Sequence, residues 1–158
     1  MPTMTAARRA DPADAGELVR LRTIMLNSLK PSTDTGWQPA AVRALRERLA
    51  DPAGDLAAFV VDGPDRTGIL AACAVGVVEH RLGSPENPAG TTGHVFSVAT
   101  DPAMRRRGYS RACMRALLGW YEERGVRRID LHASPEGEPL YASLGFARTP
   151  APAMRLTL

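Results

Sequence analysis

Hydrophobic residues recur at three- and four-residue spacing in three segments, which predicts three amphipathic helices. The first is expected to start at Asp11-Pro12, because Asp can accept the free amides of a first turn and Pro fits that turn. The second follows a polar loop at 30–39, and the third is expected at 108–124 with Gly125 as its cap. Their expected buried faces are Leu18, Leu21, Met25 and Leu29; Val42, Leu45 and Leu49; and Cys113, Ala116, Leu117, Trp120 and Tyr121.

Elsewhere the apolar residues form short runs typical of strands. The runs at 56–61 and 69–82 flank an Asp-Gly-Pro-Asp turn and predict an antiparallel hairpin. Further strands are expected at 8–10, 94–100, 129–133, 146–148 and 154–158, and a short helix at 138–144. The order is not the strict alternation of a doubly wound fold. It predicts an α+β protein with a mixed central sheet of six to seven strands, flanked by about four helices.

Length and composition favour one globular domain spanning 1–158, because 158 residues would leave two domains with marginal cores. No apolar run is long enough to span a membrane, and the N-terminal segment lacks the apolar block of a secretory signal. Cys73 and Cys113 are too few and too far apart for a disulfide framework or a zinc site. We therefore expect a cytoplasmic protein with two buried, reduced thiols and no metal.

Positive charge is concentrated between residues 105 and 128, where eight arginines stand against Glu122 and Glu123 and give +6. The whole chain carries +3, so the remainder carries −3. Arginine is common throughout this sequence, and its clustering is therefore the more informative feature. The cluster favours an anionic partner.

This cluster begins where a predicted strand gives way to the third helix. The first turn of a helix offers unpaired amides and the positive end of the helix dipole, both of which favour an anion. Gly108 has no Cβ to obstruct an approaching oxygen, and the neighbouring guanidinium groups could add charge-assisted hydrogen bonds. The segment predicts a phosphate-binding site at the start of the helix.

Two motifs in the C-terminal half resemble those of the GNAT superfamily of acetyl-CoA-dependent N-acetyltransferases. Arg-x-x-Gly-x-Ser at 105–110 resembles the acetyl-CoA signature Gln/Arg-x-x-Gly-x-Gly/Ala, with Ser110 at the last small position. The segment LYASLGF at 140–146 resembles the family's Leu-Tyr-x-x-Leu-Gly-Phe. The resemblance covers 93–158 in detail and 8–92 only in the order of elements. It implies an acetyl-CoA-binding half at 93–158 and an acceptor-shaping half at 8–92.

The resemblance also implies how acetyl-CoA, as co-substrate, is bound. The pantetheine arm would pair with the backbone of the fourth strand, and the pyrophosphate would lie on the amides at the start of the third helix. Ser134 stands where relatives often have an Asn that contacts the cofactor. The residues assigned to these roles are Val98, Ala99 and Thr100 for the arm; Arg105, Arg106, Arg107, Gly108, Tyr109, Ser110 and Arg111 for the pyrophosphate; and Ser134.

Direct attack of an amine on the thioester is the simpler route, and the resemblance implies that a tyrosine protonates the departing thiolate. Neither cysteine has a His nearby in sequence, so no acetyl-enzyme is expected. Tyr141 is the expected general acid, or else a packing residue of its helix. His94, at a position where relatives carry a glutamate, is a possible base, because imidazole titrates near neutral pH. Glu79 competes for that role, a water chain without a single base is a further possibility, and His94 could instead only line the site.

The acceptor is expected to be a small-molecule or peptide amine, recognised in the region 28–38. The resemblance also suggests a homodimer, because members of the family often dimerise through sheet or C-terminal strand contacts. An alternative function on the same fold is an acyl-CoA sensor or a basic module that binds nucleic acid. With only eight Phe, Trp and Tyr residues and no readable DNA-binding motif, nucleic acid is the less favoured partner.

Overall fold

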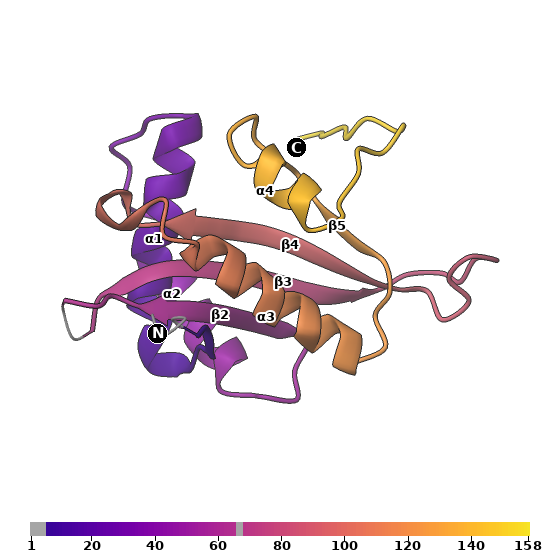
Figure 1. Ribbon diagram of the computed structural model, residues 1–158, viewed down its shortest axis with the longest axis horizontal. Coiled ribbons are helices and arrows are strands. Elements are labelled where there is room, and N and C mark those ends of the chain that lie inside the picture. Colours follow the sequence, from indigo (N-terminus) through magenta and orange to yellow (C-terminus); the bar gives the residue numbers. More distant parts are fainter. Residues whose placement is uncertain (1–5, 66–67) are drawn as a thin grey trace.

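The computed structural model describes residues 6–65 and 68–158 and contains a five-stranded mixed sheet (Figure 1). The strands lie in sequence order, and β4 and β5 alone are parallel neighbours, joined by a helical crossover. The expected hairpin is confirmed as the antiparallel β2–β3 pair. The strands are β1 (Arg8–Arg9), β2 (Leu56–Asp62), β3 (Leu70–His80), β4 (Thr91–Thr100) and β5 (Ile129–Leu131).

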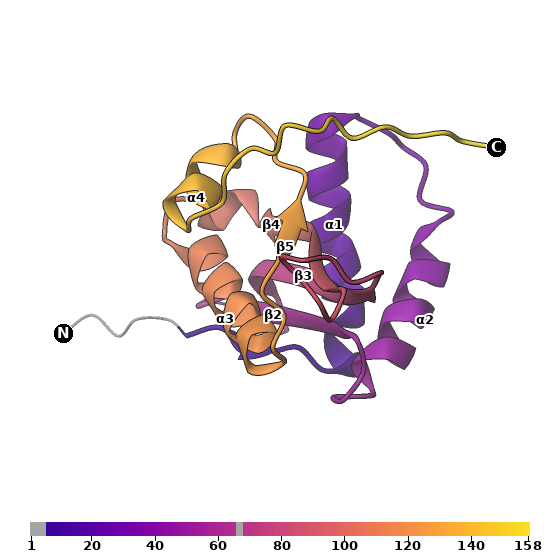
Figure 2. The ribbon, with the colours of Figure 1, turned by 90° about the vertical axis from the view of Figure 1, so that its right-hand side faces the viewer.

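Four α-helices cover the two faces of the sheet, as expected. Figure 2 shows α1 (Ala15–Leu29) and α2 (Gln38–Leu49) on one side, with α3 (Tyr109–Glu123) and α4 (Glu138–Ser143) on the other. The Asp11 side chain caps the 3-10 turn that leads into α1. In return, the Asp14 carboxylate accepts a hydrogen bond from the backbone amide of Asp11. Gly125, at φ +72°, follows the last turn of α3 as expected. Within the described ranges, none of these helices combines the length and apolar character needed to cross a bilayer.

The strands predicted at 146–148 and 154–158 do not form, so the expectation of six to seven strands was wrong. Alternating apolar residues favour an extended backbone, but a strand also needs a neighbouring edge to pair with. The C-terminal segment finds none and runs from the α4 side of the sheet toward the side that carries α1 and α2 (Figure 2). Its large side chains are left in solvent: Met154 is 91% exposed, Leu156 81% and Leu158 110%.

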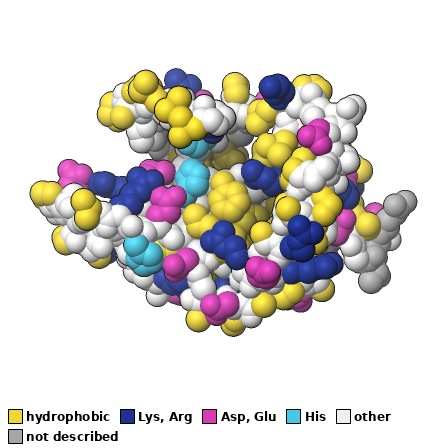
Figure 3. Space-filling model, turned by 180° about the vertical axis from the view of Figure 1, so that it is seen from behind, with side chains coloured by type: hydrophobic (Ala, Val, Ile, Leu, Met, Phe, Trp, Pro, Cys, Tyr) yellow, Lys and Arg dark blue, Asp and Glu magenta, His cyan; other side chains and the backbone are white. Residues whose placement is uncertain are grey.

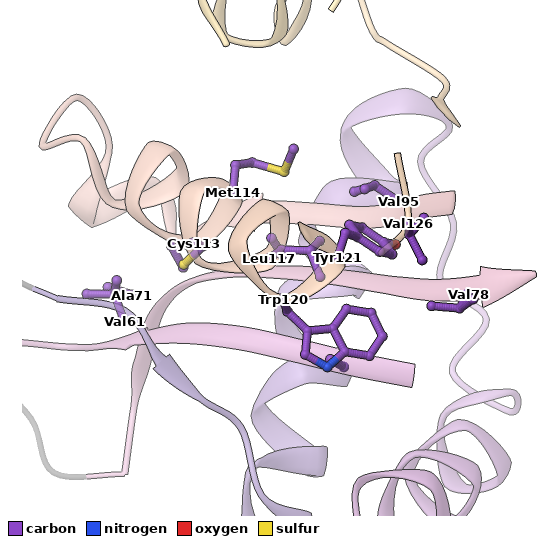
Figure 4. Packing of buried hydrophobic residues seen from close by; sticks show 13 residues of the cluster. Val61, Ala71, Val78, Val95, Cys113, Met114, Leu117, Trp120, Tyr121 and Val126 are labelled. Atoms are coloured by element: carbon purple, nitrogen blue, oxygen red, sulfur yellow. The ribbon is translucent and has the colours of Figure 1, made fainter. Parts of the chain in front are cut away.

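Two hydrophobic clusters fill the spaces on either side of the sheet. The α3 side contains Met114, Leu117, Trp120 and Tyr121, which belong to one buried cluster with residues of the strands (Figure 4). Met114 is fully buried, whereas the expected Ala116 is only partly buried. The other cluster joins Leu18 and Leu21 of α1 to the opposite face of the sheet. Its further buried members are Ala10, Leu49, Leu56, Ala58, Val60, Leu70, Cys73, Val75 and Ala99.

Tyr121 fixes α3 against the middle of the sheet. Its hydroxyl lies 3.0 Å from the Val77 carbonyl and 3.2 Å from the His94 carbonyl, and it donates to this pair of acceptors. Burial raises the pKa of Tyr121, so the hydroxyl remains a donor. The ring lies over Gly76 and Gly93, where side chains would collide with it: a Cβ on Gly93 would lie 2.7 Å from Cε1 of Tyr121. Only glycine fits at these two positions, because the Tyr121 side chain packs directly against the backbone there.

We therefore expect Gly76→Ala to lower the free energy of unfolding by about 1–3 kcal/mol, because its methyl group would overlap the Tyr121 hydroxyl. Gly119→Ala is the matched control. It lies inside α3, where nothing stands within 4 Å of the added Cβ, and should stabilise by up to about 1 kcal/mol. Urea denaturation of both variants measures the difference, and equal stabilities would contradict this account of Gly76.

Candidate functional site

The sheet opens between β4 and β5. Their pairing stops at Val95 and Leu131, whereas β4 continues beside β3 as far as Thr100. The β3–β4 register shifts between Val75 and Gly76, which leaves Phe96 as an extra residue on β4. The last five residues of β4 therefore leave one backbone edge uncovered by β5. An extended ligand could pair with this edge.

A cleft of about 420 Å³ lies at this opening. Figure 3, which faces the side of the sheet carrying α1, shows a hollow with hydrophobic, histidine and basic side chains around it. The cleft brings together four residues expected from the sequence: His94, Val98, Ser134 and Tyr141. It is also lined by Arg22, Met25, Leu26, Ser28, Leu29, Val95, Phe96, Ser97, Leu131, His132 and Arg155.

Tyr141 is held in the cleft by α4. Its ring is half-buried and contacts Phe146 edge-on, with the ring centres 6.0 Å apart. Gly137 lies so close that a Cβ there would be 3.1 Å from the tyrosine ring. Burial raises the pKa of Tyr141, so its hydroxyl is protonated at neutral pH. This phenol can donate a proton into the cleft.

Ser134 lines the cleft and also shapes the approach to α4. Its hydroxyl accepts a hydrogen bond of 3.1 Å from the Gly137 amide. This bond stabilises the turn that carries the chain from β5 into α4. Ser134 therefore helps to position Tyr141, and its own O–H remains a donor for a ligand.

The structure brings His94 to the cleft but not Glu79. The His94 ring lies 5.8 Å from the ring of His132 and 6.3 Å from that of Phe96, measured between centres. Glu79 instead accepts hydrogen bonds from Arg81 at 2.6 and 3.0 Å and does not line the cleft. Of the two base candidates, only His94 lines the cleft.

A second hollow, of about 200 Å³, lies where β4 ends and α3 begins. The loop between them is sharply coiled: Arg106 has φ +66° and Gly108 φ +78°, both in the left-handed region. An arginine in that region is strained, as residues at binding sites often are. Of the residues assigned to the pyrophosphate, this hollow is lined by Arg105, Arg106, Gly108, Tyr109, Ser110 and Arg111, together with Thr100, Met104 and Leu140.

The amides at this helix start are available to a ligand. Gly108 caps α3 without a side-chain hydrogen bond, and in the described part of the chain no protein group accepts from the amides of Tyr109, Ser110 or Arg111. Thr100 and Ser110 are hydrogen-bonded to each other, which joins the end of β4 to the first turn of α3. The helix is 15 residues long, and its dipole points a positive end at the hollow.

The Arg-rich loop is anchored by an ion-pair network from α1. Asp101, which ends β4, accepts a hydrogen bond of 2.8 Å from Arg20, and this partner lowers the pKa of the Asp101 carboxyl. Arg20 is also bonded to Glu17 and to the Leu70 carbonyl. The Asp101 side chain accepts from the Ala103 amide as well, which holds the short turn before Arg105. The loop conformation is therefore set from both faces of the sheet.

Two expected residues occupy other positions. Arg107 is exposed and lines neither hollow, while Ala99 is 7% exposed and packs into the core on the α1 side. The resemblance implies that Ala99 contributes through its backbone, and its buried side chain is consistent with that. The arginine Arg22 was missed in the sequence. It falls on the apolar stripe of α1, four residues after Leu18 and three before Met25, and a cation at such a position is the signal that could have identified it.

The residues present fit a phosphorylated thioester such as acetyl-CoA. Free helix amides, arginines and Gly108 form an anion cradle at one end of β4, and the cleft with its protonated phenol lies toward the other. Six residues of strand separate Thr100 from His94, or about 20 Å. In the described ranges no cluster of three or more His, Cys, Asp or Glu side chains could hold a metal ion.

Comparison with known proteins gives a consistent result. Residues 22–146 match the Acetyltransferase (GNAT) family. Glucosamine 6-phosphate N-acetyltransferase 1 from Oryza sativa subsp. japonica is 31% identical over 157 residues, covering 92% of this chain and 91% of that protein.

Solved structures are similar over nearly the whole chain. A predicted acetyltransferase from Clostridium acetobutylicum, crystallised with acetyl-CoA, superimposes with a TM-score of 0.82 at 23% identity, covering 98% of this chain and 96% of that one. A GCN5-related N-acetyltransferase from Ralstonia eutropha gives 0.79 at 25% identity, covering 95% of this chain and 97% of that one.

Replacement of Gly108 by Glu should weaken the binding of CoA at least about tenfold, because a carboxylate and a strained φ would be placed at the anion cradle. Gly16→Glu is the matched control, since it adds the same side chain to the first turn of another 15-residue helix, with nothing within 4 Å of the new Cβ. Calorimetry measures both affinities, and thermal unfolding shows whether each variant is folded. A folded Gly108→Glu protein with unchanged affinity would place the pyrophosphate elsewhere.

Proposed function

The chain belongs to the GNAT family of acetyltransferases, and on that premise we propose that it transfers an acetyl group from acetyl-CoA to the primary amine of a small molecule. The observation that carries this proposal is the arrangement along β4. The anion cradle lies at Thr100, the uncovered backbone edge follows, and the cleft with His94 and Tyr141 comes next. This order matches the order of pyrophosphate, pantetheine arm and thioester in the co-substrate.

The chain's own groups would hold the co-substrate at three places. Amides of the first turn of α3 and the guanidinium of Arg106 would bind the pyrophosphate. The β4 backbone from Val98 to Thr100 would pair with the arm, because β5 leaves this edge open. Bound acetyl-CoA supplies the acetyl group as a thioester.

Both cysteines are unsuited to carry an acetyl group. Cys73 and Cys113 are free thiols buried in the core, and burial raises the pKa of Cys73 to about 12 and that of Cys113 further. A thiol needs its thiolate form to attack. Direct attack by the amine is therefore the simpler route.

The proposed transfer balances with two proton movements. A bond forms between the amine nitrogen and the acetyl carbon, and the bond from that carbon to sulfur breaks. His94, directly or through water, would accept the proton that the amine loses. Tyr141 would donate its proton to the departing sulfur, because a phenol with a raised pKa is fully protonated at neutral pH. The amine is the nucleophile, so no covalent acetyl-enzyme forms.

The acceptor side of the cleft is built by the second half of α1. Ser28 and Leu29 belong to the region 28–38 in which specificity was expected, but Met25, which precedes this region, lines the cleft as well, while the loop after Lys30 is exposed. The rice relative's name makes glucosamine 6-phosphate the first acceptor to try.

The function is tested by incubating the protein with acetyl-CoA and a panel of amines and following the release of free CoA. The panel contains glucosamine 6-phosphate, glucosamine, a peptide with a free amino terminus and an aminoglycoside. Acetylation of at least one small-molecule amine is expected, with calorimetric binding of CoA. If CoA does not bind and no amine is acetylated, the proposed function is wrong.

Replacing Tyr141 by Phe should lower kcat about 100-fold while CoA affinity stays within about twofold, because only the proton donor is removed. The raised pKa also predicts a pH dependence. The ordinary pKa of tyrosine is about 10, and that of Tyr141 is raised above it. At pH values below about 10, deprotonation of Tyr141 should therefore cause no loss of rate. Steady-state kinetics at several pH values measure both. An unchanged kcat in Tyr141→Phe would assign the residue to packing.

We also propose that a second copy covers the exposed C-terminal strip of Met154, Leu156 and Leu158. These three side chains are exposed and do not line the cleft, whereas Arg155 between them does. Light scattering should give about twice the 16.9 kDa of one chain. The Leu156→Asp variant should return to the mass of one chain, and a wild-type protein that has this mass would disprove the homodimer.

A further inference from the structure

Two arginines bring positive charge to the cleft from different segments. Arg22 enters it from α1 and Arg155 from the C-terminal segment. No Asp or Glu occurs among the described residues that line it. A site that binds an amine usually needs no such set of positive groups, since they disfavour a positively charged amine. Their presence calls for a compensating negative charge.

Arg22 is the best placed of these cations. It is half-buried, and one of its terminal nitrogens donates a 3.2 Å hydrogen bond to the carbonyl of Phe96, the extra residue of the β4 bulge. Its guanidinium carbon lies 5.8 Å from the centre of the Phe96 ring. These contacts fix the plane of the guanidinium, which is thereby oriented before any ligand arrives.

Arg22 also lacks a charged partner. Arg20, two residues before it on the same helix, is paired with Glu17 and Asp101. In the described part of the chain no carboxylate lies within 4.0 Å of Arg22. A guanidinium has five N–H donors, and one of those of Arg22 is used by Phe96. A partly desolvated cation with free donors is costly unless an anion binds to it.

We infer that the acceptor is an amine that carries an anionic group, a phosphate monoester or a carboxylate, and that Arg22 binds this group on the α1 side of the cleft. The inference rests on the proposed function and goes beyond it, because it assigns the chemical class of the acceptor and the residue that selects it. Arg155 lines the same space and adds positive charge to it. Arg22 is a specificity-determining residue and takes no part in the proton transfers.

The same charges disfavour acceptors with several amines. A polycation such as an aminoglycoside needs carboxylates to bind, and like charges in a partly desolvated cleft repel it. The preferred acceptor should therefore carry one reacting amine and at least one negative charge.

The test compares acceptors that differ only in the anionic group. Glucosamine 6-phosphate is paired with glucosamine, and O-phosphoethanolamine and β-alanine are each compared with ethanolamine, which separates phosphate from carboxylate. We expect the anionic member of at least one pair to have a kcat/KM at least about tenfold higher. In Arg22→Gln, KM for that acceptor should rise about tenfold or more, while its kcat and the KM for the neutral partner stay within about threefold.

Arg46→Gln is the control, since Arg46 is exposed on α2 and lies outside the cleft. It should leave every constant unchanged. Calorimetry of CoA binding shows that each variant is folded with an intact cradle. Titration of the CoA-bound protein with glucosamine 6-phosphate, O-phosphoethanolamine and β-alanine gives a readout that needs no turnover, and binding of the preferred anion should depend on Arg22.

Two outcomes would overturn the inference while leaving the proposed function in place. One is acetylation of neutral and anionic acceptors with equal efficiency. The other is an Arg22→Gln variant that retains wild-type affinity for every anionic ligand or that loses activity equally toward both members of a pair. Absence of CoA binding together with absence of acetyl transfer would instead reject the proposed function.

Discussion

The separation of β4 from β5 after Val95 is the constraint on which the site depends. While the two strands are paired, the sheet is continuous and its backbone groups are satisfied. Beyond that point β4 is held only by β3, so its other edge and the space above it become available. The cleft, the exposed edge and the anion cradle all lie along this one strand.

Two local features keep β4 in its position. On the α3 side, Tyr121 packs on Gly76 and Gly93 and donates to backbone carbonyls of both β3 and β4. On the α1 side, Arg22 is bonded to the carbonyl of the bulged Phe96, and Arg20 holds Asp101 at the end of the strand. Contacts from both faces of the sheet therefore hold β4 near its two ends. The uncovered backbone edge of β4 need not rearrange when a ligand binds.

The sequence was informative where function depends on local backbone chemistry. The Arg-rich loop, Gly108 and the start of α3 could be found from spacing alone, because a helix start and a glycine act through adjacent residues. The C-terminal strands could not, because pairing depends on an edge that sequence alternation does not reveal. The choice between His94 and its competitor Glu79 stayed open for a related reason. Only the tertiary structure shows that Arg81 engages Glu79 and that the cleft contains His94. Arg22 was overlooked because only the hydrophobic residues on that face of α1 were considered.

The position of the Tyr121 hydroxyl has a consequence for how this protein can diverge over evolution. A single phenol contributes to core stability and also fixes the backbone that carries His94, the proposed base, so selection for folding and selection for the proposed turnover would act on the same atom. Substitutions there are doubly penalised. Three residues on the α1 side of the cleft have no comparable dual role, since Met25 is only half-buried and Ser28 and Leu29 are exposed. New substrate preferences can therefore arise by drift on α1 while the reaction chemistry is inherited unchanged.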